Sequence, residues 1–218
     1  MSTCEKRTGL VRRWLFLTVG LVIMSLGVAL SIRADLGTSP ISSVPYVACL
    51  FSPLSVGTAS IVMHCVMILI QILLLRRRYD PVQLLQLPVA VIFGWLTDAA
   101  MWVTGAIACG AYWQQWLVCV LGILLVGIGV SFEVTAGVVT LAGEGTVLAL
   151  CQVLPVKFGT MKVTFDVCLV LTACLLSLIF LGELQGVREG TVAAALCVGM
   201  VARKLNKPLG RLGEKIFA

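Results

Sequence analysis

Charged side chains are scarce in this chain. They make up 12% of its 218 residues, whereas soluble domains carry about 25%. Hydrophobic residues supply 60%, so the chain lacks the polar side chains needed to cover a water-facing surface. This balance argues against a soluble enzyme, a nucleic-acid binder and a secreted disulfide scaffold. It predicts an all-α, polytopic membrane protein.

Residues that hold metals or cofactors are also scarce. The only histidine is His64, which excludes a site built from several histidines. The nine cysteines contain no C-x-x-C pair and, apart from Cys4, lie in or beside apolar runs, as expected of small apolar fillers between helices. Nucleotide-binding, zinc-protease and serine-hydrolase motifs are absent from the sequence. We therefore expect no metal, no cofactor and no enzymatic activity.

Long apolar runs indicate how the chain crosses a membrane. A spanning helix needs about 20 apolar residues. The runs that qualify are 14–32, 55–75, 82–105, 114–132, 158–182 and a shorter one at 189–202. Two further apolar segments, 40–52 and 143–155, follow Gly/Ser/Thr-rich sequence and end near a proline, which is typical of re-entrant half helices. The sequence thus predicts a bundle of six spans and two half helices.

Lysine and arginine gather on one side of this topology. If the two short segments return to the side from which they enter, 13 cations face one side and two, Arg33 and Arg188, face the other. The cation-rich side is cytoplasmic by the positive-inside rule. The net charge of +6 is thus a topology signal and not a nucleic-acid surface. Residues 1–13 and 206–218 are predicted to be cytoplasmic tails.

The chain contains an internal repeat. Residues 14–58 align without gaps with 116–160, and 11 of the 45 paired positions are identical. The two copies extend over 14–106 and 112–205. Each copy holds three full spans, an odd number, so the second enters the membrane from the opposite side, as in secondary transporters with inverted repeats. Four spans per copy would make the copies parallel, which the Lys/Arg distribution disfavours.

Several motifs resemble a known family. The segments ADLGTSPISSVPY, SVGTAS, FGTMKVTFD and EGT are similar to those of the bacterial YczE/YyaS/YitT-type integral membrane proteins, and the resemblance covers about 27–203. It implies a multi-pass protein of the bacterial cytoplasmic (inner) membrane and supplies no substrate. Residues 143–145, Gly-Glu-Gly, depart from the Ser/Pro-rich turn of the first half, so the two half-helix turns need not bind alike.

Charges within a membrane mark functional candidates, because each costs about 2.5–3.5 kcal/mol on insertion scales. Asp166 lies near the middle of its span, and His64 is its repeat counterpart. The pair is expected to exchange a proton or to hold a polar solute, and the alternative is two structural polar residues bonded to neighbouring helices. Lys162 lies one turn before Asp166 and is expected to neutralise it or to snorkel to the surface.

The half helices add further candidates. A helix that starts within the membrane points free N–H groups and the positive end of its dipole inwards. The residues expected to bind solute at these starts are Thr38, Ser39, Ser42, Glu144 and Thr146. A capping role is the equal alternative for Glu144. Asp98 and Glu133, near the ends of their spans, are gate or interface candidates together with Lys162, and exposed placement at a loop edge is the alternative for the two acids.

These features favour a small secondary transporter or exporter of an unidentified polar or charged solute, working by alternating access between the two repeats. Proton coupling through Asp166 and His64 is an additional hypothesis. The alternative is a non-transporting assembly or regulatory partner of another membrane complex. The expected partners are the lipid bilayer and the solute. Glycines on the first and fourth spans predict close packing within one chain or between two, so a homodimer stays open.

Overall fold

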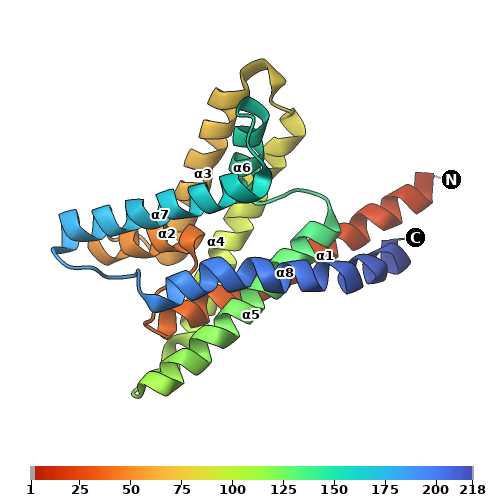
Figure 1. Ribbon diagram of the computed structural model, residues 1–218. Coiled ribbons are helices and arrows are strands. Elements are labelled where there is room, and N and C mark those ends of the chain that lie inside the picture. Colours follow the sequence, from red (N-terminus) through yellow and green to blue (C-terminus); the bar gives the residue numbers. More distant parts are fainter. Residues whose placement is uncertain (1–2, 218) are drawn as a thin grey trace.

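The computed structural model describes residues 3–217, and the secondary structure in that range is entirely helical (Figure 1). The α-helices are α1 (Thr3–Arg33), α2 (Pro40–Phe51), α3 (Val56–Leu75), α4 (Gln86–Val103), α5 (Tyr112–Ala136), α6 (Ala142–Val153), α7 (Phe158–Leu181) and α8 (Glu189–Phe217). Short 3-10 turns are η1 (Arg76–Arg78), η2 (Pro81–Leu85) and η3 (Thr104–Ala106). The predicted all-α class is confirmed.

Five stretches are long and apolar enough to cross a membrane. They are Gly9–Arg33, Val56–Arg78, Pro81–Ala106, Tyr112–Ala136 and Phe158–Leu181. They coincide with five of the predicted spans, because each of those runs is apolar over the length that a bilayer requires, although 82–105 contains Asp98 and 158–182 contains Lys162 and Asp166.

The sixth predicted span, 189–202, is not one of these five stretches. Residues 189–202 form the first half of α8, a helix of 29 residues. Its apolar part is short, since Arg203 and Lys204 follow and the helix continues through the predicted tail as far as Phe217. At the other end of the chain, α1 begins at Thr3, within the segment predicted as a tail. Both basic segments therefore extend helices.

α1 and α5 form an antiparallel pair joined through glycines. Gly20 lies against Gly129, and Gly27 lies against Gly122. A Cβ on Gly27 would lie 2.8 Å from the Gly122 carbonyl oxygen. The two backbones therefore touch, which is how small residues allow close helix packing in membranes. The glycine packing expected of the first and fourth spans is made within one chain.

The largest buried cluster lies between α1, α4 and α5. Leu17 and Leu21 of α1 pack there with Phe93 of α4 and Val126 of α5, and all four side chains are buried. α8 lies along α1 and α5 (Figure 1). Helices α1, α4, α5 and α8 thus form one packed group.

The two short segments are helices of 12 residues each, α2 and α6, close to the predicted 40–52 and 143–155. Both pack against α3 and α7, and α2 and α7 run side by side in Figure 1. Their starting turns meet, because the Ile41 side chain lies against Gly143 and leaves no room there for a Cβ. The N-terminal ends of the two half helices therefore lie together.

The two halves of the repeat differ in how their last two helices pack. In the first half, α3 and α4 touch at Gly57 and Gly94, where a Cβ on Gly94 would lie 2.7 Å from the Gly57 carbonyl oxygen. In the second half, the corresponding Gly159 and Gly199 have no neighbouring atom within 4 Å of a Cβ position. Only 11% of the apolar stretch of α7 is buried. α7 is thus covered by α2 and α6, and most of its surface is left open.

Candidate functional site

A buried carboxylate stands at the start of α6. Glu133 lies in the last turn of α5, and only 1% of its surface is exposed. Its Oε1 accepts a hydrogen bond from the Leu141 backbone N–H at 2.5 Å, at the residue that precedes α6. The carboxylate therefore satisfies one of the N–H groups that a helix start leaves unpaired. We expected Glu133 at an exposed membrane edge or in a gate, and the exposed alternative is wrong, because the turn after α5 folds the side chain inwards.

Two glutamine side chains, those of Gln71 and Gln86, lie against the first turn of α6. Gln71 of α3 is fully buried, and its Nε2 donates to the Gln86 Oε1 at 3.1 Å and to the Ala142 carbonyl at 3.0 Å. Thr146 donates to the same carbonyl at 2.7 Å and lies 3.3 Å from the Gln71 Nε2. The Gln71 Oε1 is buried without a hydrogen-bond partner. One acceptor in this cluster is therefore unsatisfied.

Gly145 explains why the second half-helix turn departs from the Ser/Pro pattern of the first. A Cβ at this position would lie 2.8 Å from the Gln86 Nε2 and 3.0 Å from the Gln71 amide atoms. The glutamines approach α6 this closely only because residue 145 has no side chain. Neither Gln71 nor Gln86 was among the predicted site residues. The available signal was the presence of amides inside apolar runs, Gln71 in 55–75 and Gln83 with Gln86 in 82–105.

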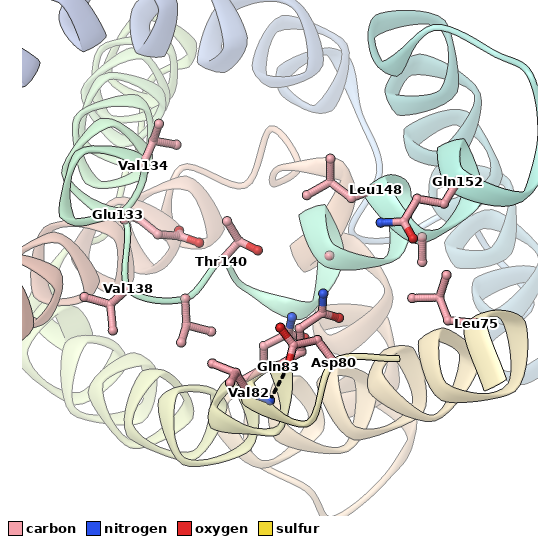
Figure 2. A pocket seen from close by; sticks show the side chains of 15 residues that line it. Leu75, Asp80, Val82, Gln83, Glu133, Val134, Val138, Thr140, Leu148 and Gln152 are labelled. Carbon is pink, nitrogen blue, oxygen red and sulfur yellow. Dashed lines mark hydrogen bonds between the residues drawn. The ribbon is translucent and has the colours of Figure 1, made fainter. Parts of the chain in front are cut away.

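A cavity of about 420 Å³ opens beside this cluster. It lies between the end of α5, the α5–α6 connection 137–140, the α3–α4 connection and α6. Its polar lining consists of Asp80, Gln83, Gln86, Glu133, Thr140 and Gln152. Figure 2 shows the Glu133 carboxylate pointing towards Thr140 and the cavity. Asp80 accepts from the Val82 backbone N–H at 3.0 Å at the opposite wall.

Helices α6 and α7 carry further charged residues. The Lys162 Nζ is 2.7 Å from the Asp166 Oδ1, as the spacing of four residues predicts. Glu144 is partly buried in the first turn of α6. The described contacts thus pair Lys162 with Asp166 on α7, whereas Glu133 is bound by the Leu141 N–H.

The start of α2 carries hydroxyl groups. The Ser39 Oγ donates to the Ser42 Oγ at 3.1 Å, and both side chains are buried. The Thr38 hydroxyl is fully buried without a hydrogen-bond partner. The structure therefore gathers Thr38, Ser39 and Ser42 at one half-helix start, and Glu144 and Thr146 at the other.

His64 of α3 lies against α4. Its buried ring stacks on Phe93 of α4, with the ring centres 5.9 Å apart. Neither ring nitrogen has a hydrogen-bond partner. Among the described residues, no hydrogen bond or ion pair joins His64 to Asp166. Proton coupling through this pair stays a prediction.

Asp98 joins two helices. Its Oδ1 accepts from the Gly57 backbone N–H at 2.7 Å, and its Oδ2 accepts from the Ser55 hydroxyl at 2.6 Å. The carboxylate thus caps the start of α3 from α4, where negative charge complements the helix dipole. This fixes the close approach of α3 and α4 and places Asp98 at an interface between helices.

Polar contacts join two connections on the side predicted to be external. The Arg188 guanidinium donates to the Asp35 carbonyl at 2.8 Å and lies 3.7 Å from the Asp35 carboxylate. The Gly190 backbone N–H donates to the Leu36 carbonyl at 2.8 Å. These contacts join the α1–α2 connection to the α7–α8 connection. The corresponding α5–α6 connection, 137–140, lines the open cavity instead.

Over residues 3–217 the regular structure is helical, and five helices in that range are long and apolar enough to cross a bilayer, which is typical of multi-pass membrane proteins. The chain belongs to the family of unknown function DUF6198, whose model matches residues 11–207. No curated protein and no solved structure matches the chain. The likeness to YczE/YyaS/YitT-type proteins remains a resemblance of motifs.

Proposed function

We propose that this protein is a small secondary transporter of a polar or charged solute across the bacterial cytoplasmic membrane. In this proposal α8 supplies the sixth span, and both termini are cytoplasmic. One observation supports this proposal most strongly. A cavity with polar and apolar lining reaches the first turns of α6 from one side, while hydrogen bonds join the connections on the opposite side. Such one-sided access is the geometry of a transporter in one of its two states.

The contacts between the halves support an inverted repeat. Gly20 corresponds to Gly122, and Gly27 corresponds to Gly129, yet the contacts run from Gly20 to Gly129 and from Gly27 to Gly122. A two-fold axis produces this exchange of partners. Ile41 and Gly143 are also counterparts, and they touch each other, as residues at such an axis do. The helix pairs α2–α7 and α6–α3 likewise exchange under the repeat.

Alternating access follows from this symmetry. The closed external contact joins the α1–α2 connection to the α7–α8 connection. Its counterpart would join the α5–α6 connection to the α3–α4 connection, and both of these line the cavity on the side assigned to the cytoplasm. In the proposed cycle, closing that side accompanies the release of Arg188 from Asp35. The structure then represents the inward-open state.

Uptake into proteoliposomes tests the proposal. Purified protein is reconstituted and offered a panel of radiolabelled amines, amino acids, carboxylates and sugars. We expect saturable uptake, with counterflow, of at least one solute class. The absence of saturable uptake across the panel, from protein shown to be folded by circular dichroism, contradicts transport.

One observation favours the alternative, a non-transporting assembly or regulatory partner. The apolar stretch of α7 is 11% buried, and Gly159 leaves space for a close helix neighbour. A partner helix or a second copy would fill this face. Native mass spectrometry of the protein from mild detergent separates the two proposals when it is combined with the uptake assay. A stoichiometric partner together with no uptake would favour assembly.

A further inference from the structure

We propose that one face of α8 binds an anionic phospholipid, with the acyl chains along the first half of the helix and the headgroup along the second. This inference goes beyond the proposed function, because lipid binding at α8 does not depend on transport. It starts from two sets of exposed side chains on this helix. The large apolar ones are Val192, Leu196 and Met200, and the cations are Arg203, Lys204, Lys207 and Arg211.

The spacing of these side chains places them in one row. Val192, Leu196 and Met200 follow one another at intervals of four residues, and Arg203 comes three residues later. Lys207 and Arg211 continue the row at intervals of four. Residues three or four apart are neighbours on one face of a helix. An apolar strip therefore runs directly into a cationic strip along α8.

The row faces away from the helices against which α8 packs. Val198 and Leu209, on the opposite side of α8, pack against the largest buried cluster, and Ala202 between them is buried. Gly199 lies beside the apolar strip, and no atom of the described residues comes within 4 Å of a Cβ position there. The apolar strip is thus open to a chain-like ligand.

Contacts with α5 fix the register of α8, which lies along that helix (Figure 1). A Cβ on Gly190 would lie 2.9 Å from the Cys119 Sγ. Further along, the Ser131 hydroxyl donates to the Ala202 carbonyl at 3.1 Å. The two contacts are equally spaced on both helices, so α5 and α8 run in parallel without a shift in register.

This register sets the depth of the cations. Ala136, the last residue of α5 and of its candidate span, is five residues beyond Ser131, and Lys207 is five residues beyond Ala202. Since α-helices rise about 1.5 Å per residue, Arg203 lies about one turn inside the end of that span and Arg211 about one turn outside. Long basic side chains at this depth reach the phosphates of the headgroups.

The charge of the row selects the class of lipid. Among the side chains that the structure describes, none of Arg203, Lys204, Lys207 and Arg211 makes an ion pair. An anionic headgroup supplies the missing counter-charge, whereas a zwitterionic headgroup brings a cation of its own. A nucleic acid would match the cations and leave the apolar strip uncovered. A phospholipid with net negative charge matches both halves of the row.

Lipids with identical acyl chains and different headgroups test the charge of the ligand. The thermal unfolding of the intact purified protein in detergent micelles is measured at pH 7 and constant ionic strength. The probes are dioleoyl phosphatidylglycerol, dioleoyl phosphatidylcholine, glycerol 3-phosphate and a short DNA duplex. We expect phosphatidylglycerol to raise Tm saturably, because a ligand of the folded state stabilises it, and to act at concentrations at least about tenfold lower than phosphatidylcholine.

The other outcomes overturn the proposal. A smaller ratio between the two lipids shows that the headgroup charge is not recognised. A saturable rise with glycerol 3-phosphate at the same concentration as with phosphatidylglycerol shows an anion site that needs no acyl chain. A rise with the DNA duplex and none with phosphatidylglycerol shows a nucleic-acid surface. No rise with any probe shows that the row binds none of them.

Substitutions then locate the site. One variant combines Arg203→Gln, Lys207→Gln and Arg211→Gln, and we expect its affinity for phosphatidylglycerol to fall by about tenfold or more, with that for phosphatidylcholine unchanged. The matched control combines Arg76→Gln, Arg77→Gln and Arg78→Gln, which removes three exposed cations of the α3–α4 connection on the same predicted side. The control is expected to retain wild-type affinity. Equal losses in the two variants, or none in the α8 variant, overturn the site.

A single substitution and a folding measurement guard against an unfolded variant. Lys207→Gln removes one exposed charge, and we expect a loss of phosphatidylglycerol affinity of about fivefold. Circular dichroism checks that each variant keeps the helical content of the wild type. Uptake by proteoliposomes is scored separately, so lipid binding without uptake leaves this inference in place and contradicts only the transport proposal. Uptake without preference for phosphatidylglycerol does the reverse.

Discussion

The starts of α2 and α6 occupy equivalent places in the repeat and carry different chemistry. Ser31 and Ser42 of the first half correspond to Glu133 and Glu144 of the second. The Ser31 hydroxyl donates to a carbonyl of its own helix, that of Gly27, at 2.9 Å, whereas Glu133 reaches across to the start of α6. One scaffold thus holds a neutral turn at the start of α2 and a charged turn beside the cavity. In the proposed transporter, the groups that select a solute therefore lie mainly in the second half.

The largest effect is expected at Glu133. Glu133→Ala leaves the Leu141 N–H unpaired in a buried position, so we expect unfolding to become easier by about 1–3 kcal/mol and uptake to be lost. The equivalent Ser31→Ala removes one hydrogen bond within a helix and is expected to cost about 0.5–1.5 kcal/mol, with uptake retained. Chemical denaturation and proteoliposome uptake of the four proteins, with Glu133→Gln as the fourth, check both. Equal effects of Glu133→Ala and Ser31→Ala would remove the distinction between the halves.

A second pair of substitutions tests the packing of α3 on α4 against that of α7 on α8. Gly94→Ala places a Cβ against Ile61 and the Gly57 backbone, so we expect a loss of about 1–3 kcal/mol. The matched Gly199→Ala meets open space and gains up to about 1 kcal/mol, because alanine favours helix. A lower Tm for Gly94→Ala and an equal or higher Tm for Gly199→Ala would support the difference in helix packing between the two halves. A clear destabilisation by Gly199→Ala would indicate that another helix covers that position.

Arg188→Ala tests the closed side. The substitution removes the bond from the guanidinium to the Asp35 carbonyl, worth about 1.5–3 kcal/mol for a charged donor when it is buried and less here, because Arg188 is partly exposed. We expect hydrogen exchange at 34–39 to quicken severalfold and exchange at 137–141 to slow, as the equilibrium moves towards the other state. Unchanged exchange in both segments contradicts a coupled pair of gates.

The smallest structural effect is expected at Asp166. Its pair with Lys162 is partly exposed, so Asp166→Asn is expected to cost only about 0.5 kcal/mol. If Asp166 carries the coupling proton, solute-driven proton flux is lost while solute binding remains. His64→Asn, at the equivalent place, is the comparison. Flux that is unchanged in Asp166→Asn excludes that role for the carboxylate.

Run length and charge predict the helices of this chain well. Five spans and both half helices follow from apolar runs bounded by charges, turns and prolines, because a bilayer imposes a minimum length on a spanning helix. The length of α8 was not predicted, since lysine and arginine end an apolar run without ending a helix. Both residues are good helix formers.

The site is less predictable, because hydropathy does not specify which faces of different helices meet. Asp166 was a candidate from its depth in its span, and Glu144 and Thr146 were candidates from their place at the start of a half helix. Gln71 and Gln86 were missed, since their role depends on Gly145 allowing both amides to approach α6. Glu133 was expected near the membrane edge because it follows its span. The tight connection between α5 and α6 places it in the interior instead.

The most direct test of the account is saturable uptake by proteoliposomes that contain wild-type protein or Glu133→Gln, run in parallel on the same panel of solutes. We expect saturable uptake and counterflow of at least one solute class by the wild type and their loss in the variant, with the two proteins equally folded by circular dichroism. Equal uptake by both proteins, or none by the wild type, contradicts the assignment of the cavity beside α6 as the transport site.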